Sequence, residues 1–392
     1  MSVKDTAEAR LAGYRAEGRW RDLKIRETLS FSHNDYLNLS RHPKILDAGQ
    51  KALKRFGAGC GGSRLLGGHH EVFEIAEENI QDFFQAPSAL FFSSGYLANL
   101  AAITALGSLV DGVVSDERTH ASHIDAISLT KKPKTIIAHQ RWQDAQIHGR
   151  QLLVAESLFS MDGCVLDKSA FLSQLHSDNF GLVDEAHAAG IFGSSGQGLF
   201  QGDEINWNQM AVVVTFGKAF GVSGAAVLGA EWVRDLLINQ ARSFIFTTAP
   251  SPVVPAMVSA ALEVLSAEPW RRESLVERSE IACAFLKSEG VSVHSLDCGS
   301  HALPTHIISL MTPGNQCAVE LAAQAQREGI GVRAIRFPTV AKGLERIRIS
   351  LNLQVTLAET QRSLERLVSL CREYSLPESI QESEKPLSPP GF

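Results

Sequence analysis

The sequence lacks the features that mark membrane, nucleic-acid-binding and disulfide-rich proteins. No apolar stretch is long enough to span a bilayer. The net charge is -6, with 37 basic residues against 43 acidic ones, so no positive excess favours nucleic acid or an anionic membrane as a partner. The 6 cysteines are scattered without a CxxC pair. We therefore expect reduced thiols, a cytoplasmic location and no metal site.

Two nucleotide-binding patterns are incomplete. Residues 184–187 read Asp-Glu-Ala-His, as in a helicase box, but a helicase also needs a GxxxxGK[ST] loop, and Gly217-Lys218 is followed by Ala219. Residues 57–62 contain GxGxxG, yet a helical pattern precedes them where the dinucleotide fingerprint requires a strand. A nucleotide-dependent oxidoreductase would rest on that loop alone and would reveal itself by nicotinamide binding.

The remaining pattern is that of a two-lobed α/β enzyme. A chain of 392 residues, 44% of them hydrophobic, can bury a large core and is expected to form more than one lobe. Apolar residues recur at helical spacing over 45–56 and 72–83. Short apolar strands are predicted at 90–92, 112–115, 152–155, 182–183, 212–215 and 225–228. Alternating helices and strands predict a mostly parallel sheet.

A second, smaller α+β lobe is predicted to follow. After a long helix from about 254 to 286, the elements expected are strands at 291–293 and 306–310, a helix at 317–328, strands at 332–337 and 346–351, and a last helix opened by a capping box at 356–359. Ser, Glu and Pro dominate from Pro377, which predicts a flexible tail. The predicted domains are an N-terminal segment 1–45, a large domain 46–275, a small domain 276–376 and the tail 377–392.

Lys218 and Asp184 are the most informative residues. Each follows a buried apolar run, 211–215 before the lysine and 180–183 before the aspartate, so both are expected at the carboxyl edge of the sheet, where open α/β sheets bind ligands. A lysine amine can form a Schiff base with pyridoxal phosphate, and a carboxylate can keep the pyridine nitrogen protonated. The pair therefore predicts pyridoxal phosphate chemistry.

Ordered motifs carry a resemblance to a known family. They begin with Asn-Asp-Tyr-Leu at 34–37, Gly-Ser-Arg-Leu at 62–65 and Ser-Gly-Tyr at 94–96, and continue through 120–122, 156–163, 184–187, 215–221 and 338–348. In this order they resemble the α-oxoamine synthases, a branch of the fold-type I pyridoxal phosphate enzymes. The resemblance runs from Asn34 to about Cys371 and implies that fold, that cofactor and a homodimer with shared active sites.

The resemblance also implies roles for particular residues. Lys218 would be the Schiff-base lysine and later the general base and acid, Asp184 the pyridine nitrogen partner, His187 a partner of the phenolic oxygen, and His120 the imidazole on the ring face. The other cofactor contacts implied are Gly95, Tyr96, Ser160 and Thr215, with Thr247 or Thr248 reaching the phosphate from the neighbouring subunit. The implied substrate contacts are Arg348, which would hold the amino-acid carboxylate, with Asn34 and Arg336 around the acyl-donor or substrate pocket.

Within the family, residues 221–226 and 333–340 look most like the members that join L-alanine to a pimeloyl thioester, of CoA or a carrier protein, in biotin synthesis. Phe73 stands where the family usually has histidine, and Ala341 where it has proline, so acyl-chain preference stays open. The alternatives are sister synthases that use glycine with acetyl-CoA or succinyl-CoA, serine with a long-chain acyl-CoA, or a medium acyl chain for a signal molecule. A catalytically silent partner subunit of this fold is a different class, which failure to bind the cofactor would favour.

Overall fold

The structure is a computed structural model that describes residues 1–21, 23, 29–176, 178–200, 205–293 and 303–374. The chain divides into two compact units. Unit 2 comprises Asn34–Ser160 and Val165–Leu275, and unit 1 comprises Met1–His33, Met161–Cys164 and Val276–Phe392. The predicted tail 377–392 lies outside the described residues, and the domain limits predicted from sequence stay predictions.

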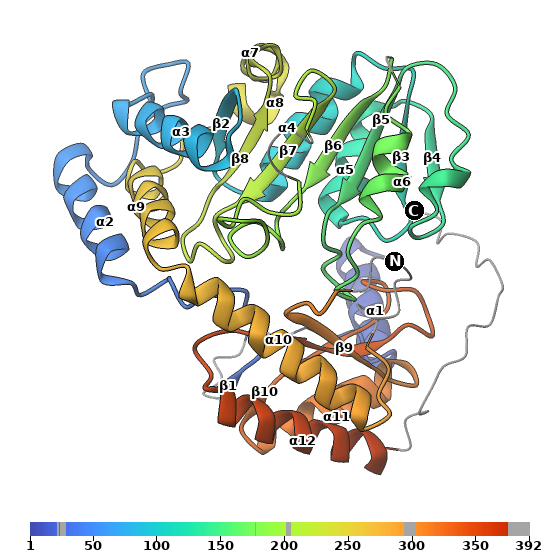
Figure 1. Ribbon diagram of the computed structural model, residues 1–392. Helices are drawn as coiled ribbons and strands as arrows, with labels where there is room; N and C mark the ends of the chain where they lie inside the picture. The colour runs from blue at the N-terminus through green and yellow to red at the C-terminus, as the bar shows by residue number, and fades with distance from the viewer. Residues whose placement is uncertain (22, 24–28, 177, 201–204, 294–302, 375–392) are drawn as a thin grey trace. The chain divides into compact units, whose positions relative to one another are not determined.

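Unit 2 is built on a seven-stranded sheet of order β2-β8-β7-β6-β5-β3-β4 (Figure 1). β8 pairs with β2 and β7 in antiparallel, and the other pairs of neighbouring strands are parallel, so the sheet is mostly parallel, as predicted. Every residue of the central strands β6 and β7 is buried, because helices cover both faces of a parallel sheet. The strands are β2 (Ser88–Phe92), β3 (Gly112–Asp116), β4 (Lys134–Ile137), β5 (Gln151–Glu156), β6 (Phe180–Asp184), β7 (Met210–Thr215) and β8 (Ala225–Gly229).

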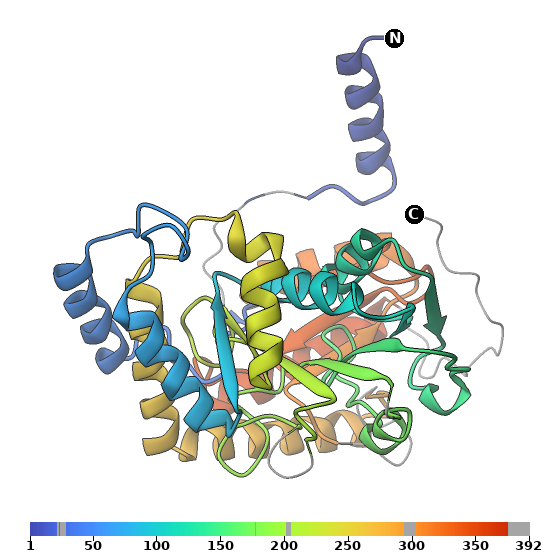
Figure 2. The same cartoon turned by 90° about the horizontal axis from the view of Figure 1, so that it is seen from above.

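Helices α4 and α7 pack against this sheet, α4 on β7 and β8, and α7 on β8 and β2 (Figure 2). Helices α2 and α3 pack on α9, and they flank the glycine-rich loop as predicted. The helices of unit 2 are α2 (Pro43–Phe56), α3 (Glu71–Phe84), α4 (Gly95–Gly107), α5 (Ala121–Thr130), the 3₁₀ helix η1 (Trp142–Asp144), α6 (Lys168–Ser173), α7 (Glu231–Gln240), α8 (Arg242–Ile245) and α9 (Val253–Ala267).

The single long helix predicted over 254–286 is wrong. The structure has α9, which ends at Ala267, and α10 (Trp270–Ser288), which crosses from unit 2 into unit 1. Pro269 separates them. Proline has no amide proton and disfavours helical geometry in the residue before it, so a helix ends ahead of Pro269 and a new one starts just after it.

Unit 1 contains two small sheets. In one, β9 and β11 flank β12 in antiparallel pairing, and in the other β1 pairs with β10 in parallel. The strand predicted at 291–293 is wrong, because these residues form no regular element. The elements of unit 1 are α1 (Val3–Ala16), β1 (Leu29–Ser30), β9 (Ile307–Met311), α11 (Gly314–Arg327), β10 (Ile330–Gly331), β11 (Arg333–Ile335), β12 (Arg346–Ser350) and α12 (Leu357–Glu373).

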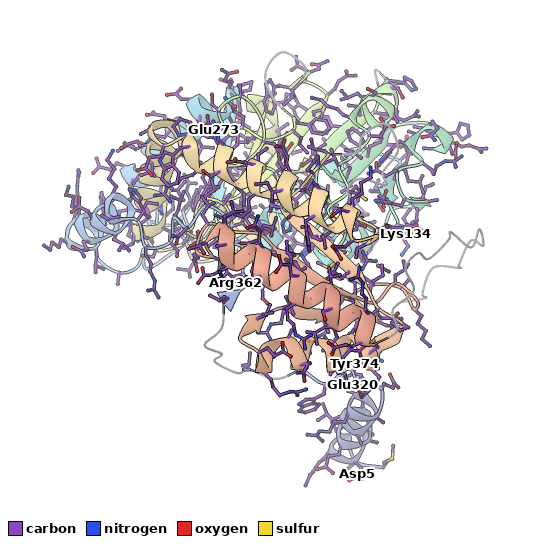
Figure 3. All side chains as sticks on the ribbon, turned by 60° about the horizontal axis from the view of Figure 1, so that its bottom comes forward. Asp5, Lys134, Glu273, Glu320, Arg362 and Tyr374 are labelled. Carbon is purple, nitrogen blue, oxygen red and sulfur yellow. The ribbon has the colours of Figure 1, made fainter. Side chains whose placement is uncertain are left out.

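Helix α12 begins at the predicted capping box. The Thr356 side chain accepts from the Glu359 amide at 3.2 Å, and the Glu359 carboxylate accepts from the Thr356 amide at 2.9 Å. One face of the helix buries Leu364 and Leu367, whereas Arg362 on the opposite face is exposed, as is Glu320 of α11 (Figure 3). Tertiary packing of this apolar face holds the helix in unit 1.

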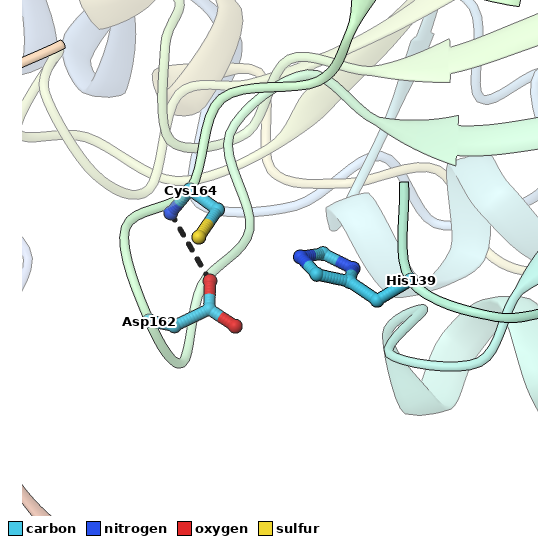
Figure 4. Close-up of side chains that lie close together, drawn as sticks. All are labelled: His139, Asp162 and Cys164. Atoms are coloured by element: carbon cyan, nitrogen blue, oxygen red, sulfur yellow. Dashed lines mark hydrogen bonds between the residues drawn. The ribbon is translucent and has the colours of Figure 1, made fainter. Parts of the chain in front are cut away.

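The cysteines depart from the sequence prediction at one position. Cys60, Cys283, Cys317 and Cys371 are free, but Cys164 is disulfide-bonded. The expectation that all the cysteines are reduced thiols is therefore wrong. The Cys164 amide donates to Asp162 Oδ1 at 3.1 Å, which tightens the turn that carries it (Figure 4). A cytoplasmic location stays a prediction.

Among the described residues, none of the helices combines the length and the apolar character needed to cross a membrane.

Gly221, in the loop after β7, provides a test of packing in unit 2. Its φ is +67°, and an added Cβ would lie 2.4 Å from the Ser40 amide nitrogen, so Gly221→Ala is expected to lower the free energy of unfolding by about 3 kcal/mol or more. Gly290 has φ +74° with no atom within 4 Å of its Cβ position. Gly290→Ala, the control, should cost only ~1 kcal/mol. Urea denaturation measures both, and equal losses would contradict this packing.

Candidate active site

Lys218 and Asp184 come from the carboxyl ends of adjacent strands. Asp184 is the last residue of β6 and pairs in register with Val213 of β7, and Lys218 lies three residues beyond the end of β7. Parallel strands end at the same edge of a sheet, so the register brings the two residues to one edge. The loop after β7 is closed by hydrogen bonds from Phe216 N to Gly224 O and from Gly221 N to Lys218 O, both at 2.9 Å.

Phenylalanines anchor the lysine loop beneath Lys218. Phe216 and Phe220 are fully buried on either side of the lysine, with ring centroids 5.2 Å apart. Phe216 stacks on Phe91 at 5.9 Å, and Phe91 in turn contacts Phe73 at 6.1 Å. Phe73, the residue that departs from the family pattern, therefore belongs to the buried aromatic layer that supports the loop.

His187 contacts the lysine directly. Its Nε2 lies 2.9 Å from Lys218 Nζ, and its Nδ1 lies 2.7 Å from the Tyr36 hydroxyl. The Tyr36 hydroxyl also donates to Asn34 Oδ1 at 3.0 Å. One hydrogen-bonded chain at the edge of the sheet thus links Lys218, His187, Tyr36 and Asn34. The sequence predicts a role for each of these residues except Tyr36.

Asp184 is a buried carboxylate with several partners. Its Oδ2 accepts from Asn99 Nδ2 at 2.7 Å and lies 3.3 Å from His123 Nε2, and its Oδ1 accepts from the Ala186 amide at 2.8 Å. Burial raises the pKa of Asp184, but the hydrogen bond and charge of His123, the charge of Lys218 and the Asn99 amide outweigh it and hold the pKa well below its ordinary range. The carboxylate therefore stays negative.

Sequence reasoning missed Asn99 and His123. Asn99 is a buried polar residue on α4, whose other buried side chains are apolar, and this interruption of an apolar face is the signal that could have found it. His123 lies three residues after His120, on the buried side of α5, where its Nδ1 lies 2.6 Å from the Thr119 hydroxyl. Both residues act on Asp184 from helices that are distant from it in sequence.

Glu185, the neighbour of Asp184, occupies a different environment. Its oxygens accept from the Leu199 and Phe200 amides at 3.1 and 2.7 Å, so it anchors the loop that follows. Burial raises the pKa of Glu185 to about 7, although those amides and the Ser157 hydroxyl lower it in part. Of the two neighbours Asp184 and Glu185, Asp184 is the one that stays ionised and interacts electrostatically with Lys218.

His120 is the N-cap of α5 and is oriented by the first turn of that helix. Its Nδ1 lies 2.8 Å from the Ser122 hydroxyl and accepts from the Ser122 amide at 3.2 Å. Partial desolvation of the ring lowers the pKa of His120, and the Asp184 carboxylate opposes that shift. A neutral imidazole held in this way presents a flat, uncharged face, which suits contact with an aromatic ring.

The N-terminus of α4 lies against the end of β7. Ser94 caps the helix by accepting from Leu97 N at 3.3 Å, and an added Cβ at Gly95 would lie 3.6 Å from Thr215 Cβ. Unpaired amides and the positive end of the helix dipole favour a phosphate at such a place. Tyr96 is half-exposed and donates its hydroxyl to Asp125.

The other predicted residues are placed as follows. Ser160 is buried at the end of a unit 2 segment, Thr247 is half-buried and Thr248 is exposed, and no described hydrogen bond joins these three to Lys218. Arg336 and Arg348 belong to unit 1. There, Arg336 donates to the carbonyls of Gly18 and Trp20, and Arg348 lies on β12 opposite Ser309. Their substrate roles stay predictions.

The fold and these donors together define a fold-type I pyridoxal phosphate enzyme. The family model for aminotransferase class I and II matches residues 26–367, and the chain belongs to this family. The 8-amino-7-oxononanoate synthase of Mycolicibacterium smegmatis is 38% identical over 361 residues, which is 87% of this chain and 90% of the relative. Within the family the chain is an α-oxoamine synthase, a kind of acyltransferase, and is most like these synthases.

Two solved structures share the fold. The crystal structure of 8-amino-7-oxononanoate synthase from Francisella tularensis has a TM-score of 0.76 and 26% identity, covering 89% of this chain and 99% of that one. The Sphingomonas wittichii serine palmitoyltransferase has a TM-score of 0.82 and 26% identity, covering 95% and 97%. The two neighbours carry different activities, so likeness of fold alone does not select a substrate.

The residues at the sheet edge fit pyridoxal phosphate. Lys218 offers an amine for the aldehyde, Asp184 a buried negative charge for the pyridinium nitrogen, and His120 a neutral ring face. Gly95 opens helix α4, and a Cβ built on it would lie in ordinary contact with Thr215, so the first amides of the helix and the Thr215 side chain lie close enough together to hold a phosphate. Among these residues are donors for each part of the cofactor.

Asp184→Asn tests whether the buried charge is needed. The change keeps shape but removes charge, so we expect turnover to fall on the order of 10²–10³-fold. The control is Asp116→Asn, because Asp116 is also buried at the end of a parallel strand and pairs with His139 at 3.0 Å. Turnover and thermal unfolding should be measured for both. Equal losses of turnover would contradict a specific role for the Asp184 charge.

Proposed function

We propose that the chain catalyses the decarboxylative condensation of L-alanine with a pimeloyl thioester, of CoA or a carrier protein. The products would be 8-amino-7-oxononanoate, carbon dioxide and the free thiol carrier, as a step of biotin biosynthesis. The observation that supports this most is the 2.9 Å contact of Lys218 with His187 beside the buried Asp184, in a chain 38% identical to a synthase of that name.

Each residue then has a defined task. When bound, pyridoxal phosphate withdraws electrons from the carbon that carries the substrate amine. Lys218 holds the cofactor covalently before the amino acid arrives, and afterwards removes and returns a proton at the substrate α-carbon. Asp184 would keep the pyridine nitrogen protonated, and His187 would bond the phenolic oxygen. Decarboxylation makes the condensation irreversible.

The remaining predicted residues bind and orient the substrates and the cofactor. His120 would lie on the ring face, and Gly95, Tyr96 and Thr215 would hold the phosphate, with Ser160 as a further cofactor contact. Arg348 would clamp the alanine carboxylate with its planar guanidinium, which matches a carboxylate with two parallel hydrogen bonds. Asn34 and Arg336 would line the acyl-donor pocket. These assignments rest on the family pattern, and the geometry of unit 2 supports those at the sheet edge.

A substrate panel tests the reaction. The cofactor-loaded protein is incubated with L-alanine, glycine or L-serine, each with pimeloyl-CoA, acetyl-CoA, succinyl-CoA or palmitoyl-CoA, and products are identified by mass spectrometry with thiol release. We expect product from L-alanine with pimeloyl-CoA, and kcat/KM for L-alanine should exceed that for glycine by about 10–200-fold, because a missing methyl contact costs ~1–3 kcal/mol. The Lys218→Ala variant is the blank.

A different winning pair would contradict the proposal and assign a sister synthase. Serine with palmitoyl-CoA is the pair named for the serine palmitoyltransferase neighbour, and product from that pair would assign its activity to this chain. Absence of turnover with every pair, together with failure to bind pyridoxal phosphate, would favour a silent partner subunit.

We further propose a homodimer in which Thr247 or Thr248 completes the phosphate site of the partner. Lys218→Ala and the double variant Thr247→Ala/Thr248→Ala are co-expressed with different tags. If the threonines act across the dimer, one site of each mixed dimer is intact, and activity should recover to about a quarter of wild type. Mixed dimers of Lys218→Ala with Asp184→Asn, whose residues share a subunit, should recover none. No recovery in isolated mixed dimers of the first kind would refute the shared site.

A further inference from the structure

Tyr36 is a buried phenol at the centre of the hydrogen-bonded chain that ends at Lys218. Its side chain is fully buried, its hydroxyl lies 2.7 Å from His187 Nδ1, and it donates to Asn34 Oδ1 at 3.0 Å. A buried phenol hydroxyl requires hydrogen-bond partners, and one of the two found here is His187, the residue that touches Lys218. The hydroxyl is therefore placed to control His187.

The number of protons on each group sets the direction of the hydrogen bonds that Tyr36 makes with Asn34 and His187. A phenol has one proton, and an amide oxygen can only accept, so the proton of Tyr36 goes to Asn34. The Tyr36 oxygen is then an acceptor toward His187, and Nδ1 of His187 must carry the imidazole proton. The other ring nitrogen, Nε2, keeps its lone pair, and it faces Lys218 Nζ at 2.9 Å.

We propose that Tyr36 is a positioning residue that holds the His187 imidazole in the tautomer whose Nε2 accepts a proton from Lys218. The proton moves from Nζ to Nε2, which leaves a neutral amine with its lone pair and an imidazolium whose Nδ1–H stays on the Tyr36 oxygen. A neutral amine is the form that attacks the cofactor aldehyde. The inference rests on the proposed chemistry of Lys218, but not on the identity of the amino acid or thioester.

Other charges around this chain stay constant when Tyr36 is changed. Asp184 and His120 interact electrostatically with Lys218. Glu185 is turned toward the Leu199 and Phe200 amides, and it interacts electrostatically with Asp184. A change in pH dependence after loss of the Tyr36 hydroxyl alone is therefore attributable to His187.

Tyr36→Phe removes the hydroxyl and keeps the ring. Uptake of pyridoxal phosphate by the full chain is followed by visible absorbance across pH. In Tyr36→Phe the His187 Nδ1–H loses the Tyr36 oxygen as its acceptor, which weakens the preference for the tautomer whose Nε2 accepts from the lysine. We expect the pH at which the uptake rate is half-maximal to rise by about one unit. At pH values below this midpoint, uptake by Tyr36→Phe should be about tenfold slower than uptake by the wild type.

Two further variants distinguish a positioning role of the Tyr36 hydroxyl from a role in stability alone. Ser88→Ala removes another buried hydroxyl, which donates to Gly229 O at 2.8 Å far along the sheet, and should lower thermal stability without moving the pH profile. In a His187→Asn background, Tyr36→Phe should have no further effect on the profile, because its action passes through His187. A profile unchanged by Tyr36→Phe, or an additive effect in the His187→Asn background, would overturn the proposal.

Nitrogen-15 NMR of the histidine side chains reads the tautomer without the cofactor, and the His187→Asn variant identifies the signal. The proposal requires Nδ1–H in the wild type and a shift toward Nε2–H in Tyr36→Phe, and Nε2–H in the wild type would refute it. Failure of the wild type to take up pyridoxal phosphate would count against the proposed function, whereas this measurement judges Tyr36 independently.

Discussion

The site depends on a negative charge kept inside the protein. Asp184 ends β6 in a buried position, and an unpaired buried carboxylate costs several kcal/mol or takes up a proton. Asn99 of α4 and His123 of α5 are polar partners of the Asp184 carboxylate, and the Ala186 amide, in the turn after β6, donates to it. These partners stabilise the charged form. Helices α4 and α5 pack on each other, so the same packing that covers the sheet also supplies the partners of the charge.

The strand register brings the Asp184 charge and Lys218 to the same edge of the sheet. Because β6 and β7 are parallel neighbours, the residues after them meet at one edge, and the turn after Asp184 places His187 against Lys218. The lysine loop rests on buried phenylalanines and closes on the antiparallel β8. Lys218 is therefore held by the buried phenylalanines of its loop and by its hydrogen bond with His187. Glu185, the residue after Asp184, accepts from the Phe200 amide and anchors a different loop.

Much of unit 2 could be predicted from the sequence, because strands buried on both faces leave continuous apolar runs and helices leave a 3.6-residue period. The edge strand β4 was missed since three of its four residues are exposed and carry no such run. Val291–Val293 has the apolar pattern of a strand, but pattern alone supplies no pairing partner. Helix α1 was missed because none of its residues is buried.

The candidate site was predicted in its main residues but not in its supporting ones. Lys218 and Asp184 could be found because each follows a recognisable strand. Asn99, His123 and Tyr36 could not be assigned, since their importance arises from tertiary contacts with residues 85, 61 and 151 positions away, at Asp184 and His187. Local pattern does not encode such pairings, and only the folded sheet edge reveals them.

The proposed chemistry requires Asp184 to keep the cofactor nitrogen protonated. The most direct measurement is the nitrogen-15 chemical shift of pyridoxal phosphate labelled at the ring nitrogen and bound to the protein, followed as pH is raised until the chain unfolds. We expect a protonated nitrogen throughout, at pH values where the free cofactor has lost that proton. A bound nitrogen that titrates as it does in free pyridoxal phosphate would contradict it.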